Sequence, residues 1–387
     1  MAYYITNDST MIKKLNFIAF LSLIFIGFVA CSDNSIAPVD ADPEIPELEL
    51  ISTLQTQIGT ERTDVIDAEL ASNGVVILGA YKDLDSSCIG MKLFLAKVSF
   101  DGKELWKRKY SDIDASKCDR LDLVITDADE VVVFGATRVV ETGDYDYHVY
   151  KFTTVGDLMW QQTIDYARLD IIISGTHKAN GEIVAYPYET SSSTFRKVTL
   201  DTNGNILEDI KNPIFPGEEF SIFNTPSRKK IYSSLNESST DLKVYDKNLQ
   251  NILDTTLPYI AYINGTIDPQ DGYFGYKYSE SSFIKLNSNF EVEWQYKYDF
   301  DIASVPIQIE QNRYANISSR SYSPGNGESP VISVIEDGGQ LLSRSVITAA
   351  DGSYPDTKKA LTSGNNDIIF VYQNELNFGV NVYRNNF

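Results

Sequence analysis

Cysteine and histidine are the first side chains of this 387-residue sequence to consider for a metal site or a nucleophile. Cys88 and Cys118 stand far from the two histidines, His148 and His177, which is not the spacing of a zinc site. No histidine is placed beside either thiol by the sequence, so a catalytic cysteine is not indicated. We predict no metal site. Cys88 and Cys118 form a candidate disulfide in an oxidising compartment, with two free thiols as the alternative.

Acidic side chains are the second set of candidates, because carboxylate pairs act as acid and base on glycosides and oxygen clusters bind calcium. Those in expected loops are Asp83, Asp85, Asp112, Asp114, Asp144 and Asp146. The sequence contains no calcium loop of the Asp-x-Asp-x-Asp-Gly type, no sialidase box, no phosphate-binding loop, no nucleophile elbow and no His-Glu-x-x-His. A solvated acidic surface is the simpler interpretation, and we predict no catalytic residue and no cofactor.

Tyrosines in expected loops could form a ligand surface, because an exposed tyrosine can stack on a sugar or hold a peptide. The candidates are Tyr145, Tyr147, Tyr322 and Tyr354. Packing of these rings on the rim of the fold is the alternative.

The composition favours strands and excludes one class of partner. The formal net charge is −21, with 33 Lys and Arg against 54 Asp and Glu, so the chain lacks the basic surface that nucleic acid binding needs. Aromatic residues make up 12% and are accompanied by many β-branched residues, and no long amphipathic helix follows residue 50. We predict an all-β protein that does not bind nucleic acid.

A six-residue sequence motif, called the phrase below, repeats along the chain, and Asp101–Trp106 is one copy. Its copies show where the strands are expected. All three tryptophans, Trp106, Trp160 and Trp294, close one copy each. Three more copies lack the tryptophan: Asn203–Glu208, Leu249–Asp254 and Gly338–Ser343. The spacing of roughly 40 to 54 residues is the repeat range of propellers. Around each phrase a strand, a tight polar turn, a second strand, a loop and a third strand recur, which predicts four-stranded blades.

The blade count depends on how the ends of the chain are used. The turn between first and second strands occurs about seven times, but the phrase occurs about six times, and the last unit lacks its outer strand. The segment Leu48–Ile58 is a spare strand before the first unit. We predict a seven-bladed β-propeller closed by this N-terminal strand in the last blade, with six or eight blades as alternatives.

The copy Asp101-Gly-Lys-Glu-Leu-Trp106 resembles the repeats of quinoprotein-like propellers, which carry Gly-Lys-Glu-Leu-Trp at this turn. The resemblance implies the blade fold, with each tryptophan packed against the adjoining blade. A propeller divides its loops between two faces, and the longer loops here share one face, where function is expected. Cys88 and Cys118 lie in adjacent loops of that face, consistent with a disulfide.

The N-terminal residues have the features of a targeting sequence. Lys13 and Lys14 precede an apolar run, Leu15–Ala30, of about 16 residues, which is short for a membrane span and typical of a signal peptide, so Met11 is the expected translation start. The run ends in Phe28-Val29-Ala30-Cys31, which resembles a bacterial lipoprotein signal. The resemblance implies cleavage before Cys31 and a lipid on its sulfur. An uncleaved anchor, or a signal peptide with an incidental cysteine, is the alternative.

The segment 31–47 is acidic, contains three prolines after Cys31 and lacks basic residues, which predicts a semi-extended tether. An acidic run directly after the lipid cysteine resembles the surface-export signal of Bacteroidota lipoproteins; a plain periplasmic tether is the alternative. The expected organisation is a signal peptide at 1–30, a lipidated tether at 31–47 and a propeller at 48–387.

Three functions remain open. The first is a non-catalytic outer-membrane or cell-surface lipoprotein that contacts the membrane through its lipid and offers the propeller as a docking platform for an unidentified protein or glycan. The second is an extracellular glycan hydrolase or lyase, which would require paired carboxylates with raised pKa values in the central funnel. The third is a carbohydrate- or peptide-binding module without turnover, which would require exposed tyrosines along a groove.

Overall fold

The computed structural model describes most of the expected propeller. The described ranges are 48–58, 62–82, 91–115, 121–138, 145–165, 170–189, 194–213, 220–224, 230–235, 238–245, 251–259, 261–266, 272–277, 282–297, 307–310, 312–318, 330–347, 349, 356–363, 367–374 and 377–384. They belong to one compact unit, Ile45–Phe387. Within these ranges no helix has the length and apolar character needed to cross a membrane. The expected signal peptide and tether, including Cys31, lie outside them.

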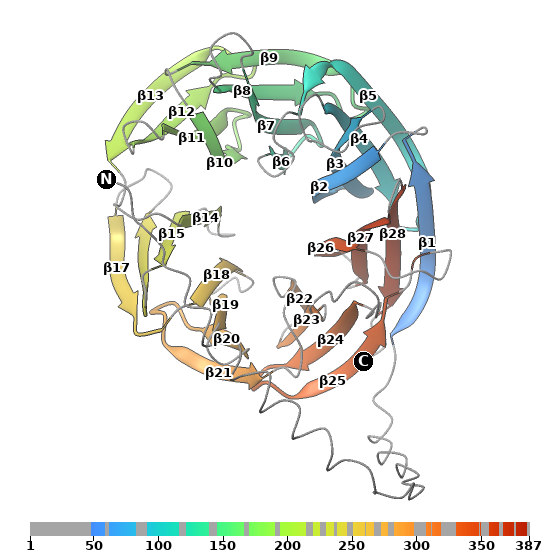
Figure 1. Ribbon diagram of the computed structural model, residues 1–387, viewed down its shortest axis with the longest axis vertical. Helices are drawn as coiled ribbons and strands as arrows, with labels where there is room; N and C mark the ends of the chain where they lie inside the picture. Colours follow the sequence, from blue (N-terminus) through green and yellow to red (C-terminus); the bar gives the residue numbers. More distant parts are fainter. Residues whose placement is uncertain are drawn as a thin grey trace, which may run out of the picture. The chain divides into compact units, whose positions relative to one another are not determined.

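The described residues form seven four-stranded antiparallel sheets, which follow one another around a central axis in Figure 1. We number them by their position along the chain. Sheet 1 is β2–β5, sheet 2 is β6–β9, sheet 3 is β10–β13, sheet 4 is β14–β17, sheet 5 is β18–β21, sheet 6 is β22–β25, and sheet 7 is β26–β28 with β1. The all-β class and the four-stranded antiparallel units predicted from the sequence are confirmed.

Within each sheet the chain runs outwards. The innermost strands are β2 (Arg62–Ala71), β6 (Leu121–Ile125), β10 (Asp170–His177), β14 (Phe220–Asn224), β18 (Ala261–Thr266), β22 (Ile307–Glu310) and β26 (Asp356–Thr362). The second strands are β3 (Gly74–Lys82), β7 (Val131–Arg138), β11 (Ile183–Glu189), β15 (Lys230–Leu235), β19 (Tyr273–Lys277), β23 (Arg313–Ser318) and β27 (Ile368–Asn374).

The third strands are β4 (Lys92–Ser99), β8 (Tyr145–Phe152), β12 (Thr194–Leu200), β16 (Thr240–Tyr245), β20 (Ser282–Leu286), β24 (Val331–Glu336) and β28 (Asn377–Arg384). The outermost strands are β5 (Glu104–Asp114), β9 (Leu158–Ile164), β13 (Ile206–Pro213), β17 (Asn251–Leu257), β21 (Val292–Lys297), β25 (Leu341–Val346) and β1 (Glu49–Gln57). The pairing expected for the segment 48–58 is present, since β1 pairs antiparallel with β28.

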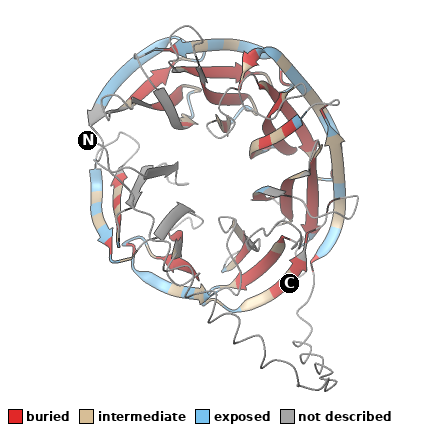
Figure 2. Ribbon diagram, in the orientation of Figure 1, coloured by how far each residue is buried: buried red, intermediate tan, exposed pale blue. Residues whose placement is uncertain are grey.

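Burial follows the position of a strand in its sheet. In sheet 1 the middle strands β3 and β4 are buried along almost their whole length, because a neighbouring sheet covers each face. The outermost strands β9, β17 and β21 alternate between exposed and half-buried residues. Figure 2 shows this as red middle strands inside a pale blue perimeter. The continuous apolar runs of the middle strands and the mixed outer strands therefore follow from one architecture.

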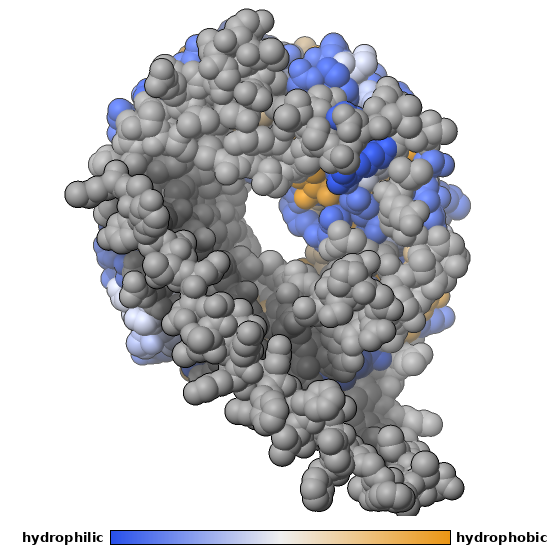
Figure 3. Space-filling model, in the orientation of Figure 1, coloured by the Kyte–Doolittle hydropathy of each residue, from blue (hydrophilic) through white to orange (hydrophobic). Residues whose placement is uncertain are grey.

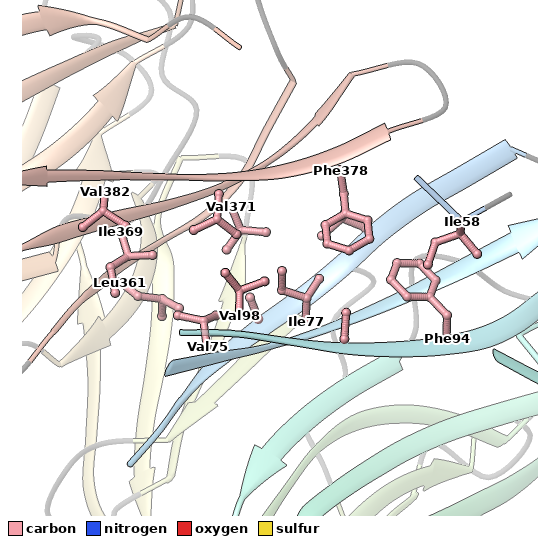
Figure 4. Close-up of a cluster of buried hydrophobic side chains, with 14 of the residues drawn as sticks. Ile58, Val75, Ile77, Phe94, Val98, Leu361, Ile369, Val371, Phe378 and Val382 are labelled. Carbon is pink, nitrogen blue, oxygen red and sulfur yellow. The ribbon is translucent and has the colours of Figure 1, made fainter. Parts of the chain in front are cut away.

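The core lies between sheets and is divided into separate clusters. One cluster joins sheet 7 to sheet 1, with Val371, Phe378 and Val382 facing Ile77 and Phe94 (Figure 4). The rings of Phe94 and Phe378 stack with centroids 5.4 Å apart. Similar clusters of described residues join sheets 1 and 2, sheets 2 and 3, sheets 4 and 5, and sheets 6 and 7. Each sheet is therefore stabilised mainly by burial against its neighbours.

Candidate functional site

The innermost strands bring three carboxylates and one ammonium together at the centre of the domain. Asp67 and Glu69 come from β2, Asp122 from β6 and Lys359 from β26. The Nζ of Lys359 lies 2.6 Å from Oδ1 of Asp67 and 2.9 Å from Oε1 of Glu69. In the space-filling view of Figure 3 the molecule is hollowed at its centre, and hydrophilic and hydrophobic described residues border the opening.

The same carboxylates bond the backbone of the next sheet. Oδ2 of Asp67 accepts a hydrogen bond from the N–H of Leu123 at 3.2 Å, across from β2 to β6. Oδ2 of Asp122 accepts one from the N–H of Gly175 at 2.8 Å, across from β6 to β10. The cluster therefore joins the inner strands of sheets 7, 1, 2 and 3, and satisfies backbone donors that these strands would otherwise leave unpaired.

Burial shifts the titration of this cluster. It raises the pKa of Asp122 to about 7, and the neighbouring charge of Asp67 acts in the same direction. Burial also raises the pKa of Glu69, although Lys359 opposes that shift. Burial disfavours the ammonium of Lys359, but the carboxylates of Asp67 and Glu69 outweigh it and raise the pKa of Lys359. The arrangement can therefore hold a proton near neutral pH. The described residues include no group of three or more side chains suited to a metal ion.

A second candidate is an open depression of about 610 Å³ between sheets 1 and 2, at the end of the sheets that carries the tight turns. We call it the junction depression. It is lined by Ser72, Asn73, Lys97, Leu105, Trp106, Asp127, Ala128, Asp129, Thr154 and Val155. The volume is in the range of small-molecule sites. Function was expected on the opposite face, where most of the long loops lie outside the described residues.

Lys97 is the buried charge of the junction depression. Its side chain is 5% exposed, and its Nζ lies 3.7 Å from Oδ2 of Asp129. The equivalent buried lysines have closer partners, with Lys151 Nζ 2.7 Å from Glu130 and Lys285 Nζ 2.9 Å from Asp337. Lys97 therefore has the loosest ion pair of the three.

Acidic groups face Lys97 across the junction depression. Burial of Asp129 favours its neutral form, but hydrogen bonds from Ser72 and the charge of Lys97 outweigh it, so the pKa of Asp129 is lowered. The side chain of Asp127 is 68% exposed, with Oδ1 3.1 Å from Nε2 of His177. The depression thus carries one ammonium, an ionised Asp129 and the solvent-exposed carboxyl of Asp127.

The tryptophans of the repeated phrase join neighbouring sheets, as the sequence predicted. The Nε1–H of Trp106 donates to the carbonyl oxygen of Thr154 at 3.0 Å, and that of Trp160 donates to the carbonyl oxygen of Thr202 at 2.9 Å. The Nε1–H of Trp294 donates to Oδ1 of Asp337 at 2.7 Å. In each case the acceptor belongs to the turn between third and fourth strands of the next sheet.

Sequence reasoning missed a lysine that accompanies each tryptophan. Lys97 pairs in register with Trp106, Lys151 with Trp160 and Lys285 with Trp294, each nine positions earlier in the sequence. At the structurally equivalent pairs the copies without tryptophan have no lysine: Thr199 pairs with Glu208, Val334 with Ser343, and Val244 with Leu253, which precedes the last residue of its copy. The joint presence of both residues was the available signal for the buried ion pairs.

Two of the predicted ligand-surface tyrosines belong to a strand. Tyr145 and Tyr147 were expected in a loop, but both lie in β8, and Tyr147 is fully buried. The prediction of Tyr147 as a ligand residue is therefore wrong. His148 follows in the same strand, and burial lowers its pKa to about 4, so its ring is neutral at physiological pH.

The other predicted site residues remain untested. Tyr322, Tyr354, Cys88 and Cys118 lie outside the described residues, as do three of the loop aspartates, Asp83, Asp85 and Asp144. The other three, Asp112 and Asp114 in β5 and Asp146 in β8, lie in strands and not in the expected loops, and Asp114 forms an ion pair with Lys92 within sheet 1. The inner-strand carboxylates were not anticipated, because they lie in strands, whereas acid–base pairs were expected in loops.

Comparison with known proteins finds similarity among solved structures. No protein-family model and no curated protein matches the sequence. Among solved structures, the chain is similar to one described as the structure of the Dos1 propeller, at 11% identity and a TM-score of 0.49. That similarity covers 87% of this chain and 95% of the other.

Proposed function

We propose that the protein is a lipid-anchored lipoprotein of the cell envelope, at the outer membrane or cell surface, whose propeller is a non-catalytic binding platform. The N-terminal sequence up to Cys31 supports the anchor, and the acidic tether supports display of the domain away from the membrane. In this proposal the seven sheets are the blades of a closed ring, with β1 as the outer strand of the last blade.

Contacts at the seam between sheets 7 and 1 support the closed ring. The hydroxyl of Ser52 on β1 donates to the carbonyl oxygen of Asp101 at 2.9 Å, and a side chain at Gly102 would collide with Ser52. Trp106 occupies the same position relative to Gly156 of the next sheet. Ser52 therefore replaces the tryptophan at the seam, and β1 meets sheet 1 in the way that one sheet meets the next.

The junction depression is the observation that carries the binding role. It is open to solvent, is large enough for a small ligand, and contains a buried ammonium whose carboxylate is 3.7 Å away. The central carboxylates, in contrast, are already bonded to neighbouring backbone groups and to Lys359. The binding surface therefore belongs to the turn end of sheets 1 and 2.

Site-specific photocrosslinking in cells tests this proposal. A benzophenone amino acid placed at Asn73, in the junction depression, is expected to give a discrete adduct of higher mass. The matched control is Asn180, an exposed residue at the corresponding turn of sheet 3. An adduct at Asn73 and not at Asn180 supports the platform. No adduct at Asn73, or equal adducts at both positions, contradicts it.

The central cluster favours a second candidate, an enzyme that cleaves extracellular glycans. Asp122 has a pKa raised to about 7 and lies beside Asp67 and Glu69, the arrangement in which one carboxyl can donate a proton while another accepts one. Release of reducing ends, or of unsaturated products, from a polysaccharide panel tests this. Activity that Asp122→Asn and Glu69→Gln each abolish would establish the enzyme, and no product from any polysaccharide would reject it.

A further inference from the structure

We propose that the junction depression binds a neutral saccharide, with Trp106 as the apolar platform and Lys97, Asp127 and Asn73 as hydrogen-bonding groups. This inference rests on the proposed binding role and adds the chemical class of the ligand. It differs from the tyrosine surface expected in the long loops, because it uses other residues at the other end of the sheets.

Trp106 is held in one orientation before any ligand arrives. Its Nε1–H is bonded to the carbonyl oxygen of Thr154, and its ring packs against Gly156, which has a φ of +85°. The ring is half-buried, so its remaining surface is hydrocarbon without a free donor. Exposed Leu105 and Val155 extend this apolar surface. The C–H face of a sugar ring fits such a platform, and a fixed ring loses little entropy on binding.

The polar groups fit hydroxyls better than charges. Lys97 offers only donors, the ionised carboxylate of Asp129 offers only acceptors, and Asn73 offers both. A hydroxyl both donates and accepts, so a sugar can satisfy all of them. Two acidic residues against one lysine disfavour an anionic ligand, and a cationic group offers only donors, so it would leave the buried ammonium of Lys97 without an acceptor. A neutral, polyhydroxylated ligand remains.

Lys97 distinguishes this junction from its closest counterpart. At the Trp160 junction the equivalent lysine, Lys151, lies 2.7 Å from Glu130. Lys97 lies 3.7 Å from Asp129, whose oxygens already accept hydrogen bonds from the N–H and the hydroxyl of Ser72. A buried ammonium with such a distant partner has donors left for a ligand. The ammonium of Lys151 is therefore held by a carboxylate of its own sheet, whereas that of Lys97 faces the more distant Asp129 of the next sheet.

Saturation-transfer NMR on the full chain, in a detergent without a sugar headgroup, tests the inference. The probes are neutral hexasaccharides of glucose, mannose and xylose in several linkages, with oligogalacturonate as the anionic comparator and a peptide pool as the alternative class. We expect binding of at least one neutral oligosaccharide. Trp106→Ala is expected to weaken it at least tenfold, about 1.4 kcal/mol, measured by calorimetry.

Matched variants separate binding from folding. Trp160→Ala removes an equivalent tryptophan from the next junction and is expected to leave affinity within about twofold, a change below 0.5 kcal/mol. Asn73→Ala and Asp127→Ala alter exposed side chains, so they keep the fold if Trp106→Ala does not, and each is expected to weaken binding about threefold or more.

Several outcomes would overturn the saccharide inference. They are no binding of any neutral oligosaccharide, binding of oligogalacturonate or peptide alone, equal loss in Trp106→Ala and Trp160→Ala, and no loss in Asn73→Ala and Asp127→Ala. A protein adduct at Asn73 in the crosslinking experiment, together with no saccharide binding, would leave the platform standing and reject only the ligand class.

Discussion

Replacing Asp122 by asparagine should make the protein more stable at alkaline pH, although it removes a hydrogen-bonded carboxylate. Oδ2 of Asp122 accepts the N–H of Gly175, and the amide oxygen of asparagine can accept the same bond. Burial and the charge of Asp67 raise the pKa of Asp122 to about 7 from 3.8. Asparagine has the shape of a protonated aspartate and carries no charge. Asp122→Asn should therefore remove the cost of ionising a buried carboxyl beside Asp67.

The sign of the effect follows from proton linkage. Because the pKa is raised by folding, the folded state holds the proton more tightly than the unfolded chain does. The resulting stability is present below about pH 4 and is lost as the pH rises to about 7. A shift of about three pKa units corresponds to about 4 kcal/mol at most. Asp122 is partly accessible to solvent, which screens its charge, and we expect a measured gain of about 1–2 kcal/mol at pH 8.

Urea unfolding of wild type and Asp122→Asn at about pH 5 and pH 8 measures the difference. The variant should gain stability relative to wild type between the two pH values, with the gain appearing at pH 8. Asp157→Asn, which neutralises an exposed carboxylate on the outer rim, serves as the control and should change stability at neither pH. If Asp122→Asn is destabilising to the same extent at both pH values, the carboxylate is ionised without cost and the burial argument is wrong.

The remaining predictions concern the centre, the tryptophan contacts and the anchor. Lys359→Met leaves two carboxylates unpaired and should cost about 2–3 kcal/mol in urea unfolding at pH 8, with recovery at acidic pH; an unchanged midpoint would show that solvent screens the pair. Gly204→Ala places a Cβ 2.8 Å from Trp160 at a φ of +86° and should lower thermal stability by about 2 kcal/mol more than Gly338→Ala, which meets no atom within 4 Å. Equal losses of stability in the two variants would mean that the ring of Trp160 moves aside to admit the new methyl group. Cys31→Ser should move the protein from the membrane fraction to the soluble fraction and abolish incorporation of labelled fatty acid, and continued lipid labelling would contradict the assignment of Cys31.

The repeated phrase made the strands predictable, because it marks the tight turn between the third and fourth strands, which has a fixed local geometry. The expected strand Leu158–Ile164 coincides with β9, and Trp160 contacts the next sheet as expected. The residue at which each third strand begins was harder to predict. Tyr147 looked like a loop residue, although the alternation from Tyr145 onwards after Gly143-Asp144 was compatible with a strand. Sheets on both sides bury that strand, and their positions cannot be read from a local window.

The central cluster could not have been assembled from the sequence. Lys359 and Asp67 stand 292 positions apart and meet because their sheets lie side by side. Each residue looks ordinary in its own segment, and only the arrangement of the innermost strands gives them a common environment. The junction depression depends on distances of the same kind, since a gap of 3.7 Å instead of 2.7 Å distinguishes Lys97 from Lys151.

The pairing of β1 with β28 has a consequence for biosynthesis. β1 can find its partner only after strands β2 to β27 have been made, because Leu50 pairs with Tyr383 and Gln57 with Asn377. Folding of the complete domain is therefore delayed until β28 has been synthesised, which in the lipoprotein proposed above leaves the chain open while it is threaded through a secretion channel. In that proposal, the contact that stabilises the folded domain also preserves the competence of the chain for export.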